Sequence, residues 1–317
     1  MSVTLPKMKV LLLGVGPIAE EYCKVLLHFQ CEIWVVGRSE INCKLFSNKF
    51  SVKTFPGTLK NNLNELIGVD FHLCIAAIPV DEIYNNIISA LNALTVKNYL
   101  VEKPVSVNFK EISDLCSYTK SSIYVAYNRR QFSSTNKLIE LLKDNRILSV
   151  HFEFTEWIDS IDKNSKFDQD IKSNWLLANS THVIDLFIYL CGYPKQFLLI
   201  NSRQIEWHSS PTIYIGSGVT EKNIFFTYNS NWISGGRWKL EVCNSIGKYI
   251  LCPLEGLSFM ARNSVEIENV TLENELDIRF KPGFFKQIEK LLNNDYNGLC
   301  SIDEHKLNFS FYQLVKE

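Results

Sequence analysis

A short apolar run leads directly into a glycine-containing turn and then into a helix pattern near the start of this 317-residue chain. Val10–Leu13 is the apolar run, Gly14–Pro17 is the turn, and Ile18–Phe29 has helical periodicity. The run is too short to cross a bilayer or to form the core of a signal peptide, so it is best explained as a strand buried in a parallel sheet. The chain is therefore predicted to begin with a strand–helix unit, as α/β folds do.

The same alternation of strand and helix patterns continues to about residue 126. Predicted strands lie at residues 10–13, 32–36, 72–77, 98–101 and 123–126, and predicted helices at 18–29, 63–66, 83–94 and 110–119. Strands that alternate with helices form a parallel sheet with helices on both faces. Residues 1–126 are predicted to form a doubly wound, Rossmann-type domain.

The pattern changes near Tyr127, and residues 127–317 are predicted to form a second, α+β domain. Predicted strands lie at residues 149–157, 197–201, 212–219, 222–232, 238–243, 248–253 and 264–270, and predicted helices at 134–143, 182–190 and 284–292. Consecutive strands joined by short turns indicate an open, mainly antiparallel sheet. The helix at 182–190 is predicted to be amphipathic. The polar segment Asp159–Ser173 is predicted to be a mobile loop that can act as a lid.

Composition excludes several classes of function. The chain is 46% hydrophobic, which supports two buried cores, and its formal net charge is −1 with no dense basic run. Binding to nucleic acid phosphates needs clustered Lys and Arg, so nucleic acid is not predicted as a partner. A membrane is not predicted either, because the apolar run Val10–Leu13 is too short to span a bilayer. Nine cysteines occur without C-x-x-C spacing. They indicate no metal site and fit reduced thiols in a cytoplasmic protein.

The glycine turn is predicted to bind the pyrophosphate of a dinucleotide. Gly14 suits a tight turn, Gly16 lets the backbone approach a phosphate, and Ala19 allows the helix to pack closely on the strand. Pro17 and Ile18 stand at the helix N-terminus, which favours anions. The alternative is an ordinary turn between a strand and a helix. Two further residues, Ala77 and Pro79, follow a predicted strand and are expected to line the nicotinamide pocket.

The segment after the second predicted strand bears on which dinucleotide is used. NAD sites usually carry an acidic residue here for the ribose 2′-hydroxyl, but this chain has Gly37-Arg38-Ser39. Arg38 can pair with a 2′-phosphate, and Ser39 can add a hydrogen bond. NADP(H) is therefore favoured over NAD(H), which stays possible. The alternative is that Arg38 is a solvated loop residue.

Four motifs in this order resemble the Gfo/Idh/MocA family of glucose–fructose oxidoreductases and inositol dehydrogenases. They are the glycine turn 14–19, Glu102-Lys103-Pro104, the segment 127–130 and the segment 181–185. The resemblance implies a Rossmann domain followed by a domain whose open sheet forms homodimers or homotetramers. It also implies sugars, cyclitols, sugar nucleotides or similar small polar molecules as substrates.

Lys103 is the leading candidate for proton transfer. Hydride transfer needs a group that takes or gives the hydroxyl proton, and an ammonium group can also polarise a carbonyl. The resemblance implies that Lys103 contacts the reacting oxygen, that Glu102 and Pro104 shape the cofactor site, and that Pro104 carries a cis bond. Without the motif, Lys103 would be taken as a surface lysine in a salt bridge.

His182 is the second catalytic candidate, because it matches the family histidine that shares proton transfer with a carboxylate four residues earlier. This chain has Ala178 at that place, and the adjacent Asn179 cannot act as a base. The alternative is a structural histidine. Asp185 lies one turn later and can either orient the imidazole or make a structural hydrogen bond.

The remaining candidates are assigned to substrate binding. Asn128 and Arg129 begin the second domain, while Trp175 and Asn179 follow the polar segment. An aromatic ring beside polar groups suits sugar stacking, although most such tryptophans only pack. The predicted activity is the NAD(P)-dependent interconversion of a hydroxyl and a ketone. A non-catalytic dinucleotide-sensing regulator with the same fold is the alternative, and Ala178 keeps it open.

Overall fold

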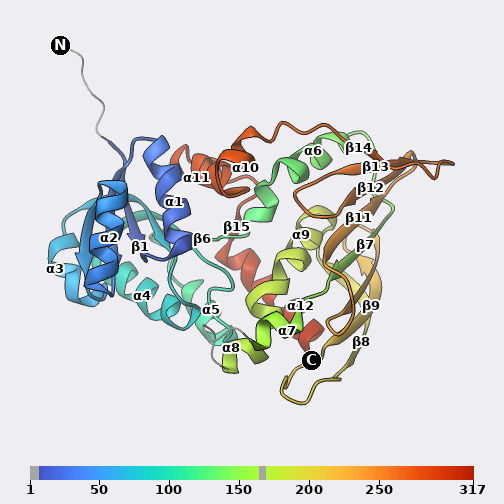
Figure 1. Ribbon diagram of the computed structural model, residues 1–317, viewed down its shortest axis with the longest axis horizontal. Coiled ribbons are helices and arrows are strands. Elements are labelled where there is room, and N and C mark those ends of the chain that lie inside the picture. Colours follow the sequence, from blue (N-terminus) through green and yellow to red (C-terminus); the bar gives the residue numbers. More distant parts are fainter. Residues whose placement is uncertain (1–6, 164–168) are drawn as a thin grey trace, which may run out of the picture. The chain divides into compact units, whose positions relative to one another are not determined.

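The computed structural model describes residues 7–163 and 169–317 and contains two compact units. The first unit comprises residues up to Asn128 and the segment Leu276–Lys306, and the second comprises Arg129–Glu275 and Leu307–Glu317. A single division after residue 126 was predicted, so the return of the later segment to the first unit is a departure from that prediction. Each unit has its own sheet, and the two are described separately (Figure 1).

The sheet of the first unit has seven strands in the order β15-β6-β5-β4-β1-β2-β3. All neighbouring strands are parallel except β15, which pairs antiparallel with β6. The predicted doubly wound parallel sheet is confirmed. The strands are β1 (Lys9–Leu13), β2 (Glu32–Gly37), β3 (Lys53–Pro56), β4 (Asp70–Ala76), β5 (Thr95–Val101), β6 (Ser122–Val125) and β15 (Cys300–Ser301).

Helices cover the two faces of this sheet (Figure 1). They are α1 (Pro17–His28), α2 (Glu40–Phe50), α3 (Leu63–Leu66), α4 (Val80–Ala93), α5 (Phe109–Leu115) and α11 (Phe284–Leu292), with α10 (Glu275–Arg279) before the last. The sequence did not predict α2 and β3, because α2 buries only Cys43 and Phe46 and lacks a clear apolar stripe.

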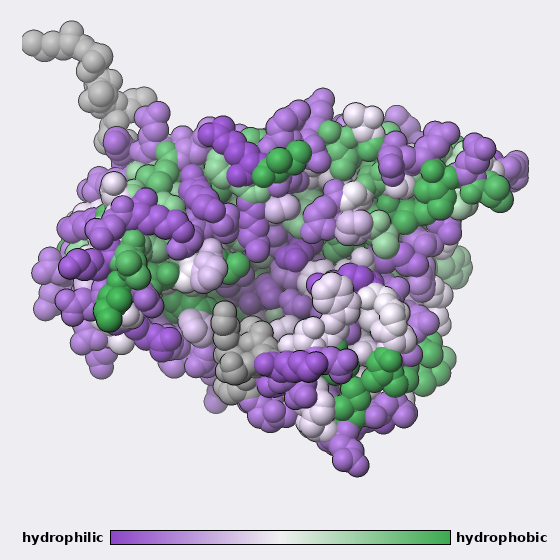
Figure 2. All heavy atoms as spheres, in the orientation of Figure 1, coloured by the Kyte–Doolittle hydropathy of each residue, from purple (hydrophilic) through white to green (hydrophobic). Residues whose placement is uncertain are grey.

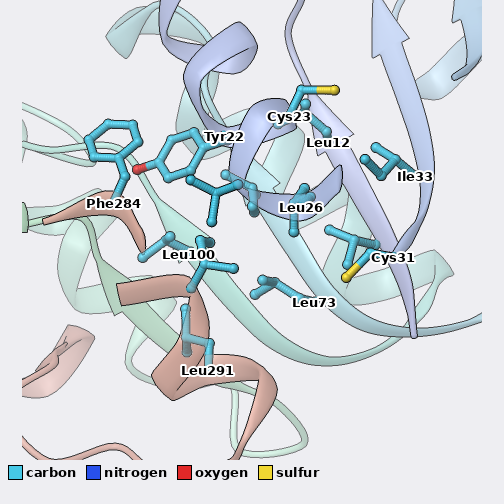
Figure 3. Close-up of a cluster of buried hydrophobic side chains, with 14 of the residues drawn as sticks. Leu12, Tyr22, Cys23, Leu26, Cys31, Ile33, Leu73, Leu100, Phe284 and Leu291 are labelled. Atoms are coloured by element: carbon cyan, nitrogen blue, oxygen red, sulfur yellow. The ribbon is translucent and has the colours of Figure 1, made fainter. Parts of the chain in front are cut away.

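The segment Leu276–Lys306 joins the first unit through its apolar side chains. Tyr22 of α1 stacks on Phe284 of α11, with ring centroids 4.3 Å apart (Figure 3). Leu291 of α11 is 2% exposed and belongs to the same buried cluster as Leu26 and Leu100. Burying these side chains stabilises the return of the chain to the first sheet.

The sheet of the second unit has eight strands in the order β14-β13-β12-β11-β7-β10-β9-β8. It is mainly antiparallel, as predicted, and only β7 and β10 run parallel. A strand was predicted at 264–270, but the structure has only the two-residue β14 there and places an unpredicted strand, β13, earlier. The strands are β7 (Ser149–Phe154), β8 (Pro194–Ser202), β9 (Ile213–Thr220), β10 (Phe225–Asn231), β11 (Trp238–Cys243), β12 (Gly247–Leu251), β13 (Ser258–Ala261) and β14 (Glu268–Asn269).

Helix α9 (Thr181–Cys191) packs on one face of the second sheet, with Phe187 stacked on Phe152 of β7 at 4.6 Å (Figure 1). Every residue from Thr181 to Ile188 is buried, so the prediction of an amphipathic helix is wrong. A helix that is apolar around most of its circumference is a core helix. It ends at Gly192, whose φ of +85° favours glycine.

The segment Asp159–Ser173 was predicted to be a loop. Its described ends are helical, with α7 (Ile158–Asp162) before it and α8 (Gln169–Ser173) at its close, and the residues between, 164–168, lie outside the described residues. One turn of π-helix, Leu176–Ser180, connects to α9.

The other helices are α6 (Ser133–Leu141) and α12 (Ile302–Lys316), and α12 begins in the first unit and ends in the second.

The surface drawn in Figure 2 is mostly hydrophilic, and its hydrophobic side chains form small separate groups. Across residues 7–163 and 169–317, no helix combines the length and the hydropathy that a membrane crossing requires.

Candidate functional site

The glycine turn forms one wall of a cavity of about 300 Å³ in the first unit. Strand β1 lies between β2 and β4, so the chain order reverses there and a crevice opens at the carboxyl ends of the strands. The lining includes six residues predicted to bind the cofactor: Gly14, Gly16, Arg38, Ser39, Ala77 and Pro79. Pro17 and Ile18 occupy the first turn of α1 beside the cavity and are not among its lining residues.

The two glycines of the turn have different structural roles. Gly14 has a φ of +115°, and a Cβ atom there would stand 2.3 Å from the carbonyl oxygen of Ala77. The turn and the end of β4 therefore fit together only with glycine. Gly16 precedes α1, and a Cβ atom there would meet no atom within 4 Å. The open space at Gly16 and the backbone N–H groups at the start of α1 suit an approaching phosphate.

Arg38 and Ser39 both reach the cavity, but each already has a partner in the protein. The Ser39 hydroxyl oxygen accepts from the backbone N–H of Asn42 at 3.2 Å and caps α2. The guanidinium of Arg38 forms an ion pair with Glu82, in the first turn of α4. Sequence analysis missed Asn42, Glu82 and Asn86 as lining residues, because they come from helices that carry no motif.

The segment Glu102-Lys103-Pro104 follows β5, two strands along the sheet from β1. The peptide bond before Pro104 is cis, as predicted. The hydroxyl of Tyr22 donates to the Glu102 carboxylate at 2.8 Å, which ties this segment to α1. Burial, and then the Glu102 charge, raise the pKa of Tyr22 well above its usual value. Lys103 is half-buried and is not among the residues that line the 300 Å³ cavity.

His182 stands in the first turn of α9 in the second unit and is 3% exposed. Its Nε2 atom lies 3.0 Å from an Nη atom of Arg129, and its ring lies 5.7 Å from that of Trp238. The Arg129 guanidinium also lies 5.1 Å from the Trp238 ring. The structure thus brings the catalytic candidate His182 together with Arg129, one of the predicted substrate residues. Asn128, by contrast, belongs to the first unit and donates to the carbonyl oxygen of Pro282 at 2.9 Å.

Asp185 makes a structural ion pair with Arg130. The Nε and Nη atoms of Arg130 donate to the two carboxylate oxygens at 2.8 and 2.6 Å, and both side chains are at most 1% exposed. The Tyr312 hydroxyl contacts the same carboxylate at 3.4 Å. Of the two roles considered for Asp185, these contacts favour the structural one, since bidentate pairing uses both oxygens.

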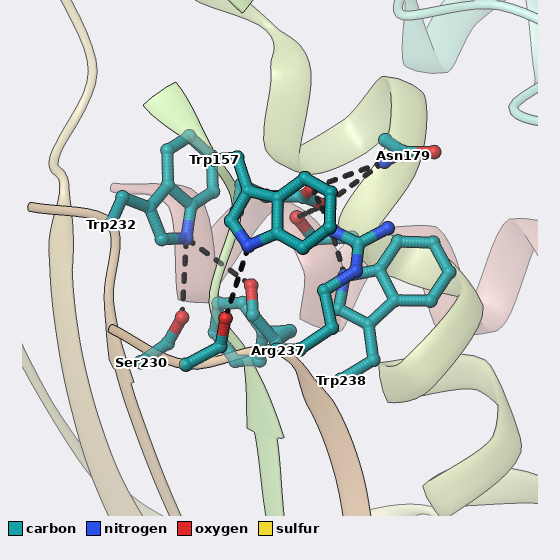
Figure 4. Close-up of polar contacts among 10 residues, drawn as sticks. Trp157, Asn179, Ser230, Trp232, Arg237 and Trp238 are labelled. Carbon is teal, nitrogen blue, oxygen red and sulfur yellow. Dashed lines mark hydrogen bonds and ion pairs between the residues drawn. The ribbon is translucent and has the colours of Figure 1, made fainter. Parts of the chain in front are cut away.

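A buried carboxylate that the sequence analysis did not single out, Glu156, lies two residues after β7. It is 2% exposed and accepts hydrogen bonds from side chains on two other segments. The donors are Ser180 Oγ at 2.8 Å, Asn179 Nδ2 at 3.1 Å, Trp238 Nε1 at 3.2 Å and Arg237 Nη at 3.2 Å (Figure 4). Burial raises the pKa of Glu156, although Ser180, Arg237 and Trp238 act in the opposite direction.

Glu156 lines a second cavity, of about 170 Å³, in the second unit. Two predicted substrate residues, Trp175 and Asn179, line it, together with Glu156, Trp157, Ser160, Ile161 and Arg237. The Arg237 guanidinium lies 4.7 Å from the ring centroids of both Trp157 and Trp238 (Figure 4). The cavity therefore combines aromatic faces with hydrogen-bonding groups, as sugar sites do.

The position of Ala178 falls within the π-helical turn that precedes His182. The neighbouring residues Asn179 and Ser180 both donate to Glu156. A carboxylate from the end of β7 thus lies beside the segment that has Ala178. The only sequence signal was an acidic residue beside a tryptophan after a strand pattern, and that signal occurs too widely to identify a site.

No protein-family model matches the sequence, and no curated protein matches it. Solved structures match it over nearly the whole chain. A myo-inositol 2-dehydrogenase from Lactobacillus plantarum is 16% identical, with a TM-score of 0.73, over 97% of this chain and 96% of that one. The WlbA dehydrogenase from Chromobacterium violaceum, in complex with NADH and UDP-GlcNAcA, is 13% identical, with a TM-score of 0.71, over 99% and 95%. An NADPH-dependent oxidoreductase from Desulfitobacterium hafniense is 14% identical, with a TM-score of 0.79, over 98% and 94%.

The chain has the fold of the Gfo/Idh/MocA-type oxidoreductases. This confirms the fold that the four sequence motifs predicted. The fold also explains the position of the first cavity, because dinucleotides bind in the crevice at the switch point of a Rossmann-type sheet. Among residues 7–163 and 169–317, no group of three His, Cys, Asp or Glu side chains is arranged to hold a metal ion.

Proposed function

We propose that the protein is a nicotinamide-dinucleotide-dependent oxidoreductase that interconverts a hydroxyl and a ketone on a sugar, cyclitol or sugar-nucleotide-like substrate. The observation that carries the proposal is the cavity at the glycine turn, at the switch point of a sheet with this fold. Solved proteins of the same fold include dehydrogenases described with NADH, UDP-GlcNAcA and myo-inositol. The dinucleotide, when bound, supplies the hydride chemistry at its nicotinamide.

The residues around the first cavity fit such a cofactor. Gly14 lets the turn fit against the end of β4, and Gly16 leaves room for the pyrophosphate. Pro17 and Ile18 begin the helix whose N-terminus favours this anion. Ala77, Pro79 and Glu102 follow β4 and β5 and would shape the nicotinamide end. Arg38 and Ser39 would hold a 2′-phosphate, so NADP(H) is favoured and NAD(H) remains possible.

Two residues are proposed to move the hydroxyl proton. Lys103 is the main proton-transfer group, since a half-buried ammonium can polarise a carbonyl oxygen and give it a proton, and the neutral amine can take the proton back. His182 assists. Its Nε2 atom lies 3.0 Å from an Nη atom of Arg129, and because a guanidinium can only donate, Nε2 is the acceptor in this contact. Asn128, Arg129, Trp175 and Asn179 are proposed to bind the substrate.

A homodimer or homotetramer formed through the second sheet is part of the same proposal. One face of that sheet is covered by α9, whereas Leu198, Ile215 and Phe225 expose 62%, 47% and 68% of their surface on neighbouring strands β8–β10. Apolar side chains gathered on a sheet face suit contact with a second copy. A cytoplasmic location is supported by the nine free cysteine thiols.

Replacing Lys103 with methionine tests the catalytic assignment. We expect Lys103→Met to lower turnover by at least about 100-fold, because the proton-transfer group is lost while the apolar stem is kept. Turnover is measured with NADPH or NADH and a panel of sugars and sugar nucleotides that includes myo-inositol and UDP-GlcNAcA. Nicotinamide fluorescence checks that cofactor binding is retained.

Lys97→Met is the matched control, because Lys97 lies on the same strand, β5, and is exposed. Full activity in Lys103→Met would contradict the assignment. If the unaltered protein binds the dinucleotide but turns over none of a broad panel, the non-catalytic regulator becomes the better explanation.

A further inference from the structure

The ion pair between Arg38 and Glu82 crosses the dinucleotide cavity. Arg38 directly follows β2, and Glu82 stands in the first turn of α4, which follows β4. Because β1 lies between β2 and β4, the two side chains meet from opposite sides of the glycine turn. Both line the same cavity as Gly14 and Gly16. A ligand that reaches Arg38 in this cavity therefore also meets the carboxylate of Glu82.

Glu82 supplies the cavity with the acidic group that the end of β2 lacks. NAD sites use a carboxylate there to accept a hydrogen bond from the ribose 2′-hydroxyl. In this chain the positions after β2 are Arg38 and Ser39, and the carboxylate comes from another helix. The Glu82 side chain is 24% exposed, and its backbone carbonyl oxygen accepts from Asn86 Nδ2 at 2.8 Å, within α4. The first turn of α4 thus places Glu82 at the cavity wall.

The same carboxylate acts against a 2′-phosphate. A guanidinium has five N–H donors, so Arg38 can contact a phosphate and Glu82 together. The two anions would then lie within roughly 5 Å of each other, and their repulsion lowers phosphate affinity by about tenfold in a water-like medium. A ribose with a free 2′-hydroxyl meets no such repulsion and can donate to the carboxylate.

We propose that Glu82 is a specificity-determining residue for the dinucleotide, an inference that rests on the proposed function. It restrains the preference for NADP(H) that Arg38 creates and gives NAD(H) a carboxylate partner. The chain is thereby fitted to use both dinucleotides. Selectivity between the two dinucleotides is set by the attraction of Arg38 for a 2′-phosphate together with the repulsion of that phosphate by Glu82, and not by Arg38 alone.

The test is to titrate NADPH and NADH, followed by nicotinamide fluorescence, into the full-length protein and into Glu82→Gln. We expect Glu82→Gln to tighten NADPH binding by about tenfold, because the repulsion is removed. NADH binding should change by less than about threefold, since glutamine still accepts a hydrogen bond. Arg38→Ala, added to Glu82→Gln, should abolish the gain for NADPH.

Glu289→Gln is the matched control, because Glu289 forms an exposed ion pair with Lys286 on α11, outside the lining of the cavity. It should leave both affinities unchanged. Raising the salt concentration from about 0.05 M to 0.5 M should shrink the effect of Glu82→Gln, as an electrostatic role requires. The inference would be overturned if the ratio of NADPH to NADH affinity in Glu82→Gln stayed within twofold of the ratio in the unaltered protein. The proposed function would then remain intact. Failure of the unaltered protein to bind either dinucleotide would instead overturn the proposed function, and the inference with it.

Discussion

The glycine turn of the first unit and the Glu156 cluster of the second unit are assembled in opposite ways. The turn is built from consecutive residues, Gly14 to Pro17, at the end of one strand. The cluster gathers side chains from the end of β7, from the π-helical turn before α9 and from the start of β11. The glycine turn can therefore be recognised from the sequence, whereas the Glu156 cluster exists only after the second sheet has formed.

The two regions also differ in what limits substitution. At Gly14 the limit is steric, because backbone atoms of the neighbouring strand leave no room for a Cβ atom. At Glu156 the limit is electrostatic, because a buried carboxylate and its donors must stay matched. Substitutions in the two regions should therefore fail for different reasons, and the following predictions separate them.

The largest effect is expected when the turn is altered at Gly14. Gly14→Ala should destabilise the protein by about 4 kcal/mol, from a strained positive φ and a clash with the carbonyl of Ala77. Gly16→Ala should leave stability nearly unchanged, since its Cβ meets nothing. It should still weaken dinucleotide binding, because the methyl group occupies the space left for a phosphate. Urea unfolding and nucleotide titration of both variants measure these effects. Equal stability losses would break the distinction between the two glycines.

A smaller loss is expected when the Glu156 carboxylate is removed. Glu156→Ala should cost about 3 kcal/mol of unfolding free energy, because buried donors on Ser180 and Trp238 lose their acceptor. Glu140→Gln, which alters an exposed pair with Lys137 on α6, should change stability by less than about 0.5 kcal/mol. Chemical denaturation gives both values. Equal losses would mean that the cluster contributes no more than a surface pair.

The smallest effect is a pH dependence in the same cluster. Burial raises the folded-state pKa of Glu156 above its unfolded value, so the folded state binds the proton more tightly. The contribution of this carboxyl to stability is therefore greatest below its unfolded pKa and declines as pH rises through the folded pKa. The wild-type protein should lose stability relative to Glu156→Gln as pH is raised from about 4.5, and by less than the loss expected for Glu156→Ala. A difference that stays constant with pH would contradict the direction of the shift.

Much of the fold could be predicted because its signals are local. The strand and helix patterns before residue 126 identified most elements of the doubly wound sheet, and four short motifs identified the fold. Two elements missed in this part of the chain, α2 and β3, bury few side chains and so carry weak periodicity. The helix at 181–191 was located correctly but was wrongly predicted to be amphipathic. Its polar residues Thr181, His182 and Asp185 are buried, and they are satisfied there by hydrogen bonds and ion pairs that a sequence pattern does not reveal.

The sequence by itself determined the glycine turn, the Glu102-Lys103-Pro104 segment and the alternation of elements, because each depends on residues that are neighbours along the chain. Tertiary structure alone decided that Leu276–Lys306 returns to the first unit, where Phe284 buries its ring against Tyr22. It also decided that Glu82 meets Arg38 and that Glu156 stands beside the segment that lacks a carboxylate at position 178. These contacts join residues far apart in sequence. Their free energy comes from burial and charge pairing that arise only after the sheets have formed.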